Sequence, residues 1–416
     1  MTAQTQSNTH SPGSPDTGLT PSQNRSLRSS ATTSIQRVKD GDLGPLPVII
    51  GLIGIWVYFQ AHNGNFLTAR NLNNLILQIA VLGTLAVGLV LVLIIGEIDL
   101  SVAAVSGFCA GVLAQCLAHG WSTGASIAAA LISGALIGLI HGLLIVYFHI
   151  PSFVVTLTGL LVWQGLLLAL IGDAGEIPIS DSFIRSIAAS YLTTDFAWIL
   201  GAILVGGVLL LGLASRREVA RFGLPAVSLT RIIGRTAVVA AAAVVTILVL
   251  DSYFGVPWIL VVLVVLVVVL TAVLTQTGWG QHAYAIGGNR EAARRAGISV
   301  RGSVLTVFIV AATVGAVAGI IDASRQFAVS NAAGGGNLGL NAIAAVVIGG
   351  TSLFGGRGKA YTALLGALVI GSVSNGLDLL GESAAVKNTT TGIILLAAVA
   401  IDSLSRRRRQ LAGRAA

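Results

Sequence analysis

The stretch "LNNLILQIAVLGTLAVGLVLVLII" (residues 72–95) decides the fold class, because it carries no charged residue over a length that lets a helix cross a lipid bilayer. Similar runs recur along the 416-residue chain, in which 55% of the residues are hydrophobic and only 10% are charged. Soluble globular domains carry about 25% charged residues. Ten-residue segments of alternating hydrophobicity, which are typical of membrane barrels, are absent. The sequence therefore predicts an all-α polytopic membrane protein, whose helices satisfy their own backbone groups in lipid.

Twelve apolar segments could form the transmembrane helices. They cover residues 45–60, 72–95, 99–118, 125–148, 152–172, 196–214, 235–251, 257–275, 303–322, 341–354, 360–379 and 388–403. The tenth segment is short, so it could be re-entrant or tilted instead of a full crossing. We expect a bundle of about 10–12 spans in a domain of residues 43–404, between an N-terminal tail (1–42) and a basic C-terminal tail (405–416). The N-terminal tail is polar and lacks the apolar core of a signal peptide, which predicts disorder.

The basic residues test this division, because Lys and Arg gather in the cytoplasmic loops of membrane proteins. With these spans, 20 of the 24 basic residues fall on the side of the two termini. The exceptions are Arg70, Arg185, Arg325 and Lys387. The longest loop on the other side, residues 173–195, is net acidic. We therefore predict that both termini are cytoplasmic, and that the high pI of about 10.1 reflects topology and anionic lipid instead of nucleic-acid binding.

The residues needed for several common chemistries are missing. The nearest approach to a phosphate-binding loop, "GGTSLFGGRGKA" (349–360), has Leu353 in place of the first glycine and Ala360 in place of the hydroxyl residue. The six histidines show no metal spacing, and neither HExxH nor CxxC occurs. Cys109 and Cys116 lie about 10 Å apart along one predicted helix, too far for a disulfide. The sequence predicts no enzyme, no bound cofactor and no metal site.

The stretch "AIGGNREAARRAGIS" (285–299) is the densest polar segment between the apolar runs. Its centre is rich in helix-forming residues, Asn289 suits the N-cap, and Gly297 suits the C-terminal stop. We therefore predict a short cytoplasmic helix with a face of small residues, namely Ala292, Ala293 and Ala296. That face could enter a groove on another protein, or the helix could lie at the interface with its arginines on lipid headgroups. Composition leaves both open.

Two carboxylates, Glu97 and Asp99, interrupt about 45 apolar residues, and charges in such a position are costly enough to suggest function. They could form a tight turn at the cytoplasmic face, where Asp99 would be the N-cap of the next helix. Alternatively, they could lie at a break deeper in the bundle and form the pathway or its gate. We favour the structural role for Asp99 and leave Glu97 open. Asn375 and Asp378, in a late span, are further pathway candidates.

Other polar residues have simpler explanations. Trp163 and Gln164 suit the passage of a sugar, but an aromatic residue in a span is more often packing. The glycine-rich segment 330–358 contains three asparagines that could meet a sugar or a partner, although turn and cap roles explain them better. These are Asn331, Asn337 and Asn341.

Most of the chain, from about residue 66 to 403, resembles the membrane subunits of bacterial ABC importers for sugars, the ribose/galactose/xylose permease family. The resemblance rests on four blocks in order, at residues 66–102, 150–166, 278–300 and 341–377. The motifs "GEIDLSV" (96–102) and "VSNGL" (373–377), and the extra pair of spans before residue 276, most resemble D-xylose permeases. In this family many members have Gly where Glu97 stands.

The resemblance implies an ABC importer permease fold in the bacterial inner membrane. Two copies would form the pathway for a monosaccharide such as D-xylose, with ATP hydrolysed by a separate cytoplasmic subunit and the sugar delivered by an extracytoplasmic binding protein. Residues 276–302 would be the coupling loop that contacts the ATPase. Its coupling residues would be Asn289, Glu291, Ala292, Ala293 and Gly297. The alternatives are import of ribose or another small solute, such as a branched-chain amino acid, and an ion-coupled secondary transporter.

Overall fold

The computed structural model describes residues 46–221, 223 and 227–411, so the predicted N-terminal tail lies outside the described residues. The first half of this part contains α2 (Leu46–His62), α3 (Ala69–Ile94), α4 (Val102–Ala118), α5 (Thr123–Tyr147), α6 (Ser152–Ile171), η1 (Gly172–Ala174), β1 (Glu176–Pro178), α7 (Ser182–Ala189) and α8 (Thr194–Arg221). The second half contains α9 (Leu229–Asp251), α10 (Trp258–Gln276), α11 (Gly278–Gly288), α12 (Arg290–Arg295), α13 (Val300–Gln326), β2 (Ala328–Ser330), α14 (Leu338–Ile348), α15 (Ala360–Leu379) and α16 (Ala384–Leu411). The all-α prediction is confirmed, and each of the twelve apolar segments overlaps one of these helices, although α14 ends at Ile348, before the end of the predicted segment 341–354.

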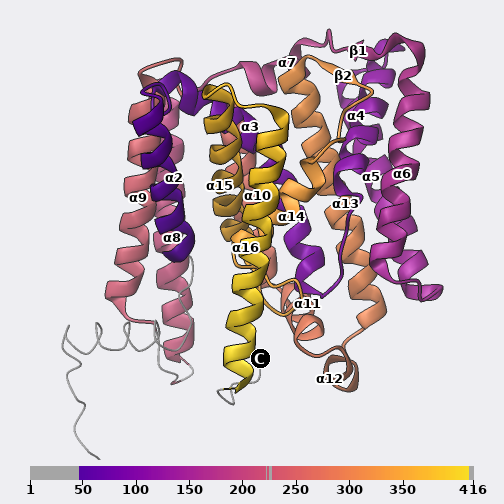
Figure 1. Ribbon diagram of the computed structural model, residues 1–416. Helices are drawn as coiled ribbons and strands as arrows, with labels where there is room; N and C mark the ends of the chain where they lie inside the picture. Colours follow the sequence, from indigo (N-terminus) through magenta and orange to yellow (C-terminus); the bar gives the residue numbers. More distant parts are fainter. Residues whose placement is uncertain (1–45, 222, 224–226, 412–416) are drawn as a thin grey trace, which may run out of the picture. The chain divides into compact units, whose positions relative to one another are not determined.

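Eight helices of the described part are long and apolar enough to cross a membrane, namely α3, α5, α6, α8, α9, α10, α13 and α15. The other four predicted segments form shorter apolar helices, which are α2, α4, α14 and the Ala384–Ala400 part of α16. Figure 1 shows the long helices running side by side between the end with β1, β2 and α7 and the end with α11 and α12. The chain is therefore a multi-pass membrane protein.

Burial separates the centre of the bundle from its edge. In α3, 83% of the most apolar window is buried inside the protein, whereas in α8 only 6% is buried. A helix that is apolar all round and surrounded by protein belongs to the core, and one whose apolar side chains remain exposed faces lipid. α3 and α13 are therefore central, and α8 and α9 form an edge of the bundle (Figure 1).

Two short helices begin inside the bundle. At 1.5 Å per residue, α4 and α14 span about 25 and 16 Å, less than the roughly 30 Å of a bilayer core. Each is preceded by a non-helical segment, residues 97–101 before α4 and residues 331–337 before α14. The second segment lies against α4, since a Cβ on Gly334 would be only 2.0 Å from the Ala103 carbonyl oxygen. The predicted tenth span is thus a half-helix that ends at Ile348.

A small antiparallel sheet closes the end of the bundle opposite α12 (Figure 1). Its register pairs Glu176 with Ser330 and Pro178 with Ala328. The sheet joins the segment that follows α6 to the segment that follows α13, so it fixes where residues 331–337 enter the bundle. These backbone connections position the two short helices, α4 and α14, within the bundle.

Candidate functional site

The helix predicted in the polar loop is present, and its ends are those expected. α12 begins after Asn289, whose side-chain oxygen accepts the backbone N–H of Ala292 at 2.9 Å. After the helix, Gly297 has φ +82°, a left-handed conformation that glycine adopts without a steric cost. The N–H of Ile298 returns to the carbonyl of Ala293 at 3.1 Å. The N-cap and stop predictions are therefore confirmed, and both ends of this one-and-a-half-turn helix are fixed.

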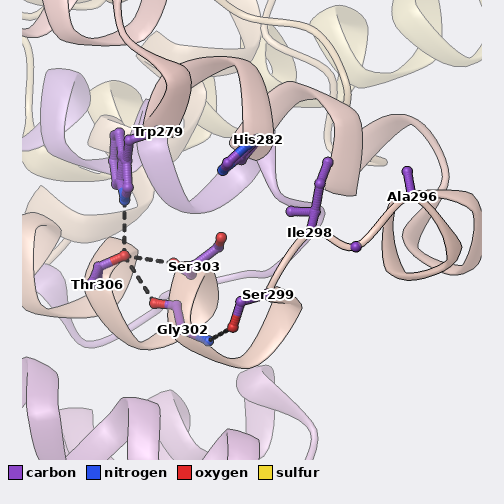
Figure 2. Close-up of a pocket in the computed structure, with 9 residues that line it drawn as sticks. Trp279, His282, Ala296, Ile298, Ser299, Gly302, Ser303 and Thr306 are labelled. Carbon is purple, nitrogen blue, oxygen red and sulfur yellow. Dashed lines mark hydrogen bonds between the residues drawn. The ribbon is translucent and has the colours of Figure 1, made fainter.

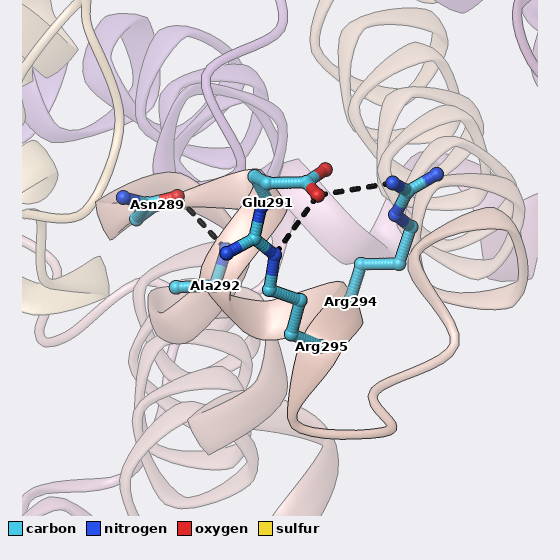
Figure 3. Close-up of polar contacts among 5 residues, drawn as sticks. All are labelled: Asn289, Glu291, Ala292, Arg294 and Arg295. Atoms are coloured by element: carbon cyan, nitrogen blue, oxygen red, sulfur yellow. Dashed lines mark hydrogen bonds and ion pairs between the residues drawn. The ribbon is translucent and has the colours of Figure 1, made fainter.

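Charged side chains cover the exposed face of α12. Figure 3 shows the Glu291 carboxylate accepting from Arg294 at 3.0 Å and from Arg295 at 3.2 Å. Ala292 is exposed beside them. Ala293, in contrast, is only 4% exposed and packs in the main core. The predicted small-residue face is therefore corrected: Ala293 anchors the helix to its own bundle, and Ala292 remains available to another molecule.

An open groove of about 460 Å³ lies between α11, the turn after α12 and the start of α13. Figure 2 shows Trp279 and His282 of α11 on one side and the first turns of α13 on the other. The indole N–H of Trp279 donates to Thr306 Oγ1 at 2.8 Å, which ties the two walls together. Sequence reasoning missed Trp279 and His282, although an aromatic residue and a histidine directly after a long apolar run were a usable signal.

Glu97 lies at the α12 end of the bundle. α3 ends at Ile94, Gly96 turns the chain with φ +79°, and Arg290 Nη1 then donates to Glu97 Oε1 at 2.8 Å. The Glu97 side chain is 11% exposed and that of Arg290 is 54% exposed. The carboxylate is thus mostly removed from water, and the first residue of α12 supplies its countercharge.

The junction beside this ion pair is closely packed. The N–H of Gly356 donates to the carbonyl of Ile94 at 2.8 Å. Gly287 of α11 packs against the same carbonyl, since a Cβ on Gly287 would be only 1.7 Å from its oxygen. Tyr284 Oη donates to the carbonyl of Gly358 at 2.6 Å. Burial raises the pKa of Tyr284, and the neighbouring Tyr361 raises it further, so the phenol remains a donor at neutral pH. The end of α3, the end of α11 and the turn 349–359 therefore form one unit.

Asp99 does not cap α4, so that prediction is wrong. The N-cap is Ser101, and Asp99 Oδ1 accepts the Ser101 N–H at 2.8 Å and the Ser101 hydroxyl at 2.6 Å. Asp99 is 2% exposed, which places the interruption inside the protein instead of in a surface turn. The chain is non-helical from residue 97 to 101, and the Asp99 carboxylate closes a local turn with the N-cap residue Ser101. Its side chain is satisfied locally.

The two late-span candidates lie at the other end of α3. Asn375 is buried, and its side-chain oxygen accepts from Asn71 at 2.8 Å, which joins α15 to the first turn of α3. Asp378 is paired with Lys387 and is about half exposed. Glu97 follows the last turn of α3, roughly 35 Å along the axis from Asn71. The structure therefore does not bring the four predicted pathway residues together.

Of the remaining polar candidates, Trp163 and Asn337 have side-chain partners, whereas the buried Asn341 Oδ1 has none among the described residues. Trp163 donates to His141 Nε2 at 3.0 Å and packs against Phe108 with ring centroids 5.5 Å apart, so it joins α4, α5 and α6. Asn337 donates to Asn388 at 2.7 Å. Within the described residues, no group of three or more His, Cys, Asp and Glu side chains is arranged to hold a metal ion.

Comparison with known proteins agrees with this architecture. The family model for the permease component of branched-chain amino acid transport systems matches residues 71–399. The xylose transport system permease protein of Escherichia coli (strain K12) is 38% identical over 89% of this chain and 94% of its own length. That of Haemophilus influenzae is 36% identical over 89% and 99%, and the ribose import permease protein of Bacillus subtilis is 31% identical over 87% and 94%. No solved structure matches the chain significantly. The chain therefore belongs to this family of membrane permease components of transport systems.

Proposed function

We propose that this chain is the transmembrane subunit of an ABC importer for D-xylose, in which a separate subunit hydrolyses ATP. The substrate is inferred from the difference in sequence identity between this chain and two groups of relatives. Identity is 36–38% to the xylose permeases and 28–31% to the ribose permeases, over similar lengths. The description of the family model names branched-chain amino acids, but these relatives favour a pentose. Ribose import is the second candidate.

The distribution of charge supports an orientation with α12 in the cytoplasm. Arg290, Arg294 and Arg295 lie on α12 itself, and cytoplasmic loops of membrane proteins are enriched in such residues. The loop beside the β1–β2 sheet carries Asp173, Glu176 and other acidic residues instead. This orientation puts both termini in the cytoplasm and leaves the sheet end to meet an extracytoplasmic sugar-binding protein.

α12 and the groove beside it are the proposed contact for the ATP-binding subunit. The helix is held at both ends by its caps, its outer face presents Glu291 and Ala292, and Ala293 fixes it to the core. A rigid, exposed element can transmit a displacement that a frayed loop would absorb. Asn289 and Gly297 contribute by holding the helix ends. A second copy of the chain would complete the translocation pathway, with lipid around both copies.

Among the predicted pathway residues, Asp99 is the one we retain. Asp99 is buried beside the first turn of α4. The first turn of α14 lies next to that of α4, because a Cβ on Gly339 would be 3.4 Å from the Ala103 side chain. The two half-helices thus begin close together within the bundle. Asn375 is less suitable, because it lies at the opposite end of α3, where its contact with Asn71 joins α15 to the first turn of α3.

The test is uptake of labelled xylose into liposomes that contain this chain, with and without its ATPase and binding protein. Uptake that needs ATP and all three proteins is expected. Uptake by this chain alone, driven by an ion gradient, would contradict the ABC assignment and favour a secondary transporter. Competition with unlabelled ribose and leucine distinguishes the substrates.

The docking of α12 is tested with a bulky substitution on its exposed face. Ala292→Trp is expected to abolish co-purification of the ATPase without loss of folding, because the side chain at this position lies outside the core. Ala189→Trp, on an exposed position of α7 at the opposite end, is the matched control. Equal recovery of the ATPase with both variants would show that α12 is not the contact.

A further inference from the structure

The ion pair between Glu97 and Arg290 joins α12 to the interrupted part of the bundle. Among the salt bridges of the described residues, it is the only one that links α12 to another element. The two residues are far apart in the sequence, and their closest atoms are 2.8 Å apart. The other arginines of α12 pair with Glu291 within the same helix. Arg290 therefore connects this helix to the rest of the molecule by charge.

The segment that carries Glu97 is held by side chains of α6. The N–H of Ile98 donates to Ser152 Oγ at 3.2 Å, and Thr156 Oγ1 donates to the carbonyl of Ile98 at 3.2 Å. One residue later, Asp99 is bonded to Ser101 at the start of α4. A displacement of Glu97 therefore acts on the start of α6 and on the start of the half-helix α4.

The two partners differ in exposure, so separation of the ion pair has a different cost for each of them. Arg290 can be solvated if the pair separates, but Glu97 is largely buried. Removing the partner of a buried carboxylate leaves an uncompensated charge, which is strongly unfavourable. If α12 moves, the low-energy response is for the segment 95–101 to follow it. Gly96, in its left-handed conformation, marks the corner about which this segment leaves α3.

We propose that Arg290 is a positioning residue, which moves the interrupted segment between α3 and α4 together with α12 and so couples ATP hydrolysis to passage of the solute. This proposal rests on the proposed function, since it assumes that α12 contacts the ATPase. It assigns Glu97 to transmission instead of to the pathway. It also distinguishes Arg290 from Arg294, whose only ion pair in the described residues is with Glu291.

The experiment uses the full complex in liposomes and measures two quantities at once, xylose taken up and ATP hydrolysed. The variants are Arg290→Gln, Glu97→Gln and the double variant, with Arg235→Gln, at an exposed position of α9 outside the proposed ATPase contact, as the matched control. Each single variant is expected to keep its ATPase and most of its hydrolysis, while xylose taken up per ATP falls at least fivefold. The double variant is expected to fall no further than the single variants, because both changes break the same link. Arg235→Gln is expected to match the wild type.

Three results would overturn the proposal. Uptake per ATP could stay within twofold of the wild type in both single variants. The losses could multiply in the double variant, which would show independent roles. Finally, only Arg290→Gln could be impaired, with loss of the ATPase on co-purification, which would make Arg290 a direct docking residue. Failure of the proposed function is distinct, because the wild-type complex itself would then show no ATP-dependent uptake. The melting temperature of each variant in detergent identifies a variant that has simply unfolded.

Discussion

Replacing Gly287 with alanine tests the packing of the junction between α3, α11 and the turn 349–359. A Cβ at Gly287 would lie 1.7 Å from the carbonyl oxygen of Ile94 and 2.4 Å from the N–H nitrogen of Gly356. Real Cβ atoms essentially never approach within 3.0 Å of another atom, and both neighbours belong to the backbone. The methyl group must therefore push apart the two groups that form the 2.8 Å hydrogen bond of the junction.

The expected loss of stability follows from three terms. Forcing a methyl group into a closely packed site costs about 1–3 kcal/mol. Losing the backbone hydrogen bond adds about 0.5–1.5 kcal/mol. Alanine in a helix offsets about 0.5–1 kcal/mol relative to glycine. The net destabilisation is about 2 kcal/mol, which corresponds to a melting temperature lower by roughly 4 °C or more.

The control is the neighbouring residue of the same helix. A Cβ at Gly288 would meet no atom within 4 Å, so Gly288→Ala changes the helix propensity without the clash. The melting temperature of each purified variant in detergent, followed by tryptophan fluorescence, gives the comparison. Gly287→Ala should melt clearly below the wild type, and Gly288→Ala should melt at or slightly above it. If both variants melt within about 1 °C of each other, the junction is not packed as described.

Two further changes test single polar contacts. The Thr123 hydroxyl and the backbone N–H of α7 hold the pKa of Asp181 below its ordinary value of 3.8, so the stabilisation by the ionised form is present above pH 3.8 and is lost as the pH falls through the lowered pKa. Asp181→Asn should therefore melt below the wild type at about pH 6, with a difference that narrows in acid; a pH-independent difference would contradict this assignment. Tyr284→Phe should cost about 1 kcal/mol by leaving the Gly358 carbonyl unpaired, whereas Tyr147→Phe, at an exposed position, should leave the melting temperature unchanged.

The helices were predictable because their signals are local. Each apolar segment became a helix, since a long run without charge can satisfy its backbone in lipid only as a helix. The ends of α12 were predictable for the same reason: the Asn289 cap and the Gly297 stop act within a few residues of themselves. The prediction that Ala293 shares an exposed face failed, because burial of a one-and-a-half-turn helix depends on which side the bundle occupies.

The short length of the tenth segment already indicated α14, but the start of the half-helix α4 was not predictable, because its cause is contact between distant segments. Asp99 indicated an interruption, but the composition of residues 100–118 does not differ from that of an ordinary span. α4 starts at Val102 where the segment 331–337 approaches it, and that approach depends on small residues such as Gly107 and Gly334. The same limit applies to Asn375. A lone polar residue in a span suggests a pathway, but only the fold reveals that Asn71 is its partner.

The non-helical segment after α3 contributes both to the stability of the fold and to coupling with the ATPase. A broken helix leaves backbone groups that cannot remain unpaired inside a protein, and here other elements supply the partners. The turn 349–359 supplies Gly356 for Ile94, and α6 supplies Ser152 and Thr156 for Ile98. These bonds define the resting position of the segment, whereas the ion pair of Glu97 with Arg290 links the segment to α12. A substitution at Gly287 should therefore lower the melting temperature in every nucleotide state of the ATPase. A substitution at Arg290 should leave the fold intact but reduce the xylose taken up per ATP hydrolysed. The opposite outcome is that the Arg290 variant is destabilised and the Gly287 variant loses only coupling. It would mean that the ion pair stabilises the fold and that the backbone junction transmits the movement.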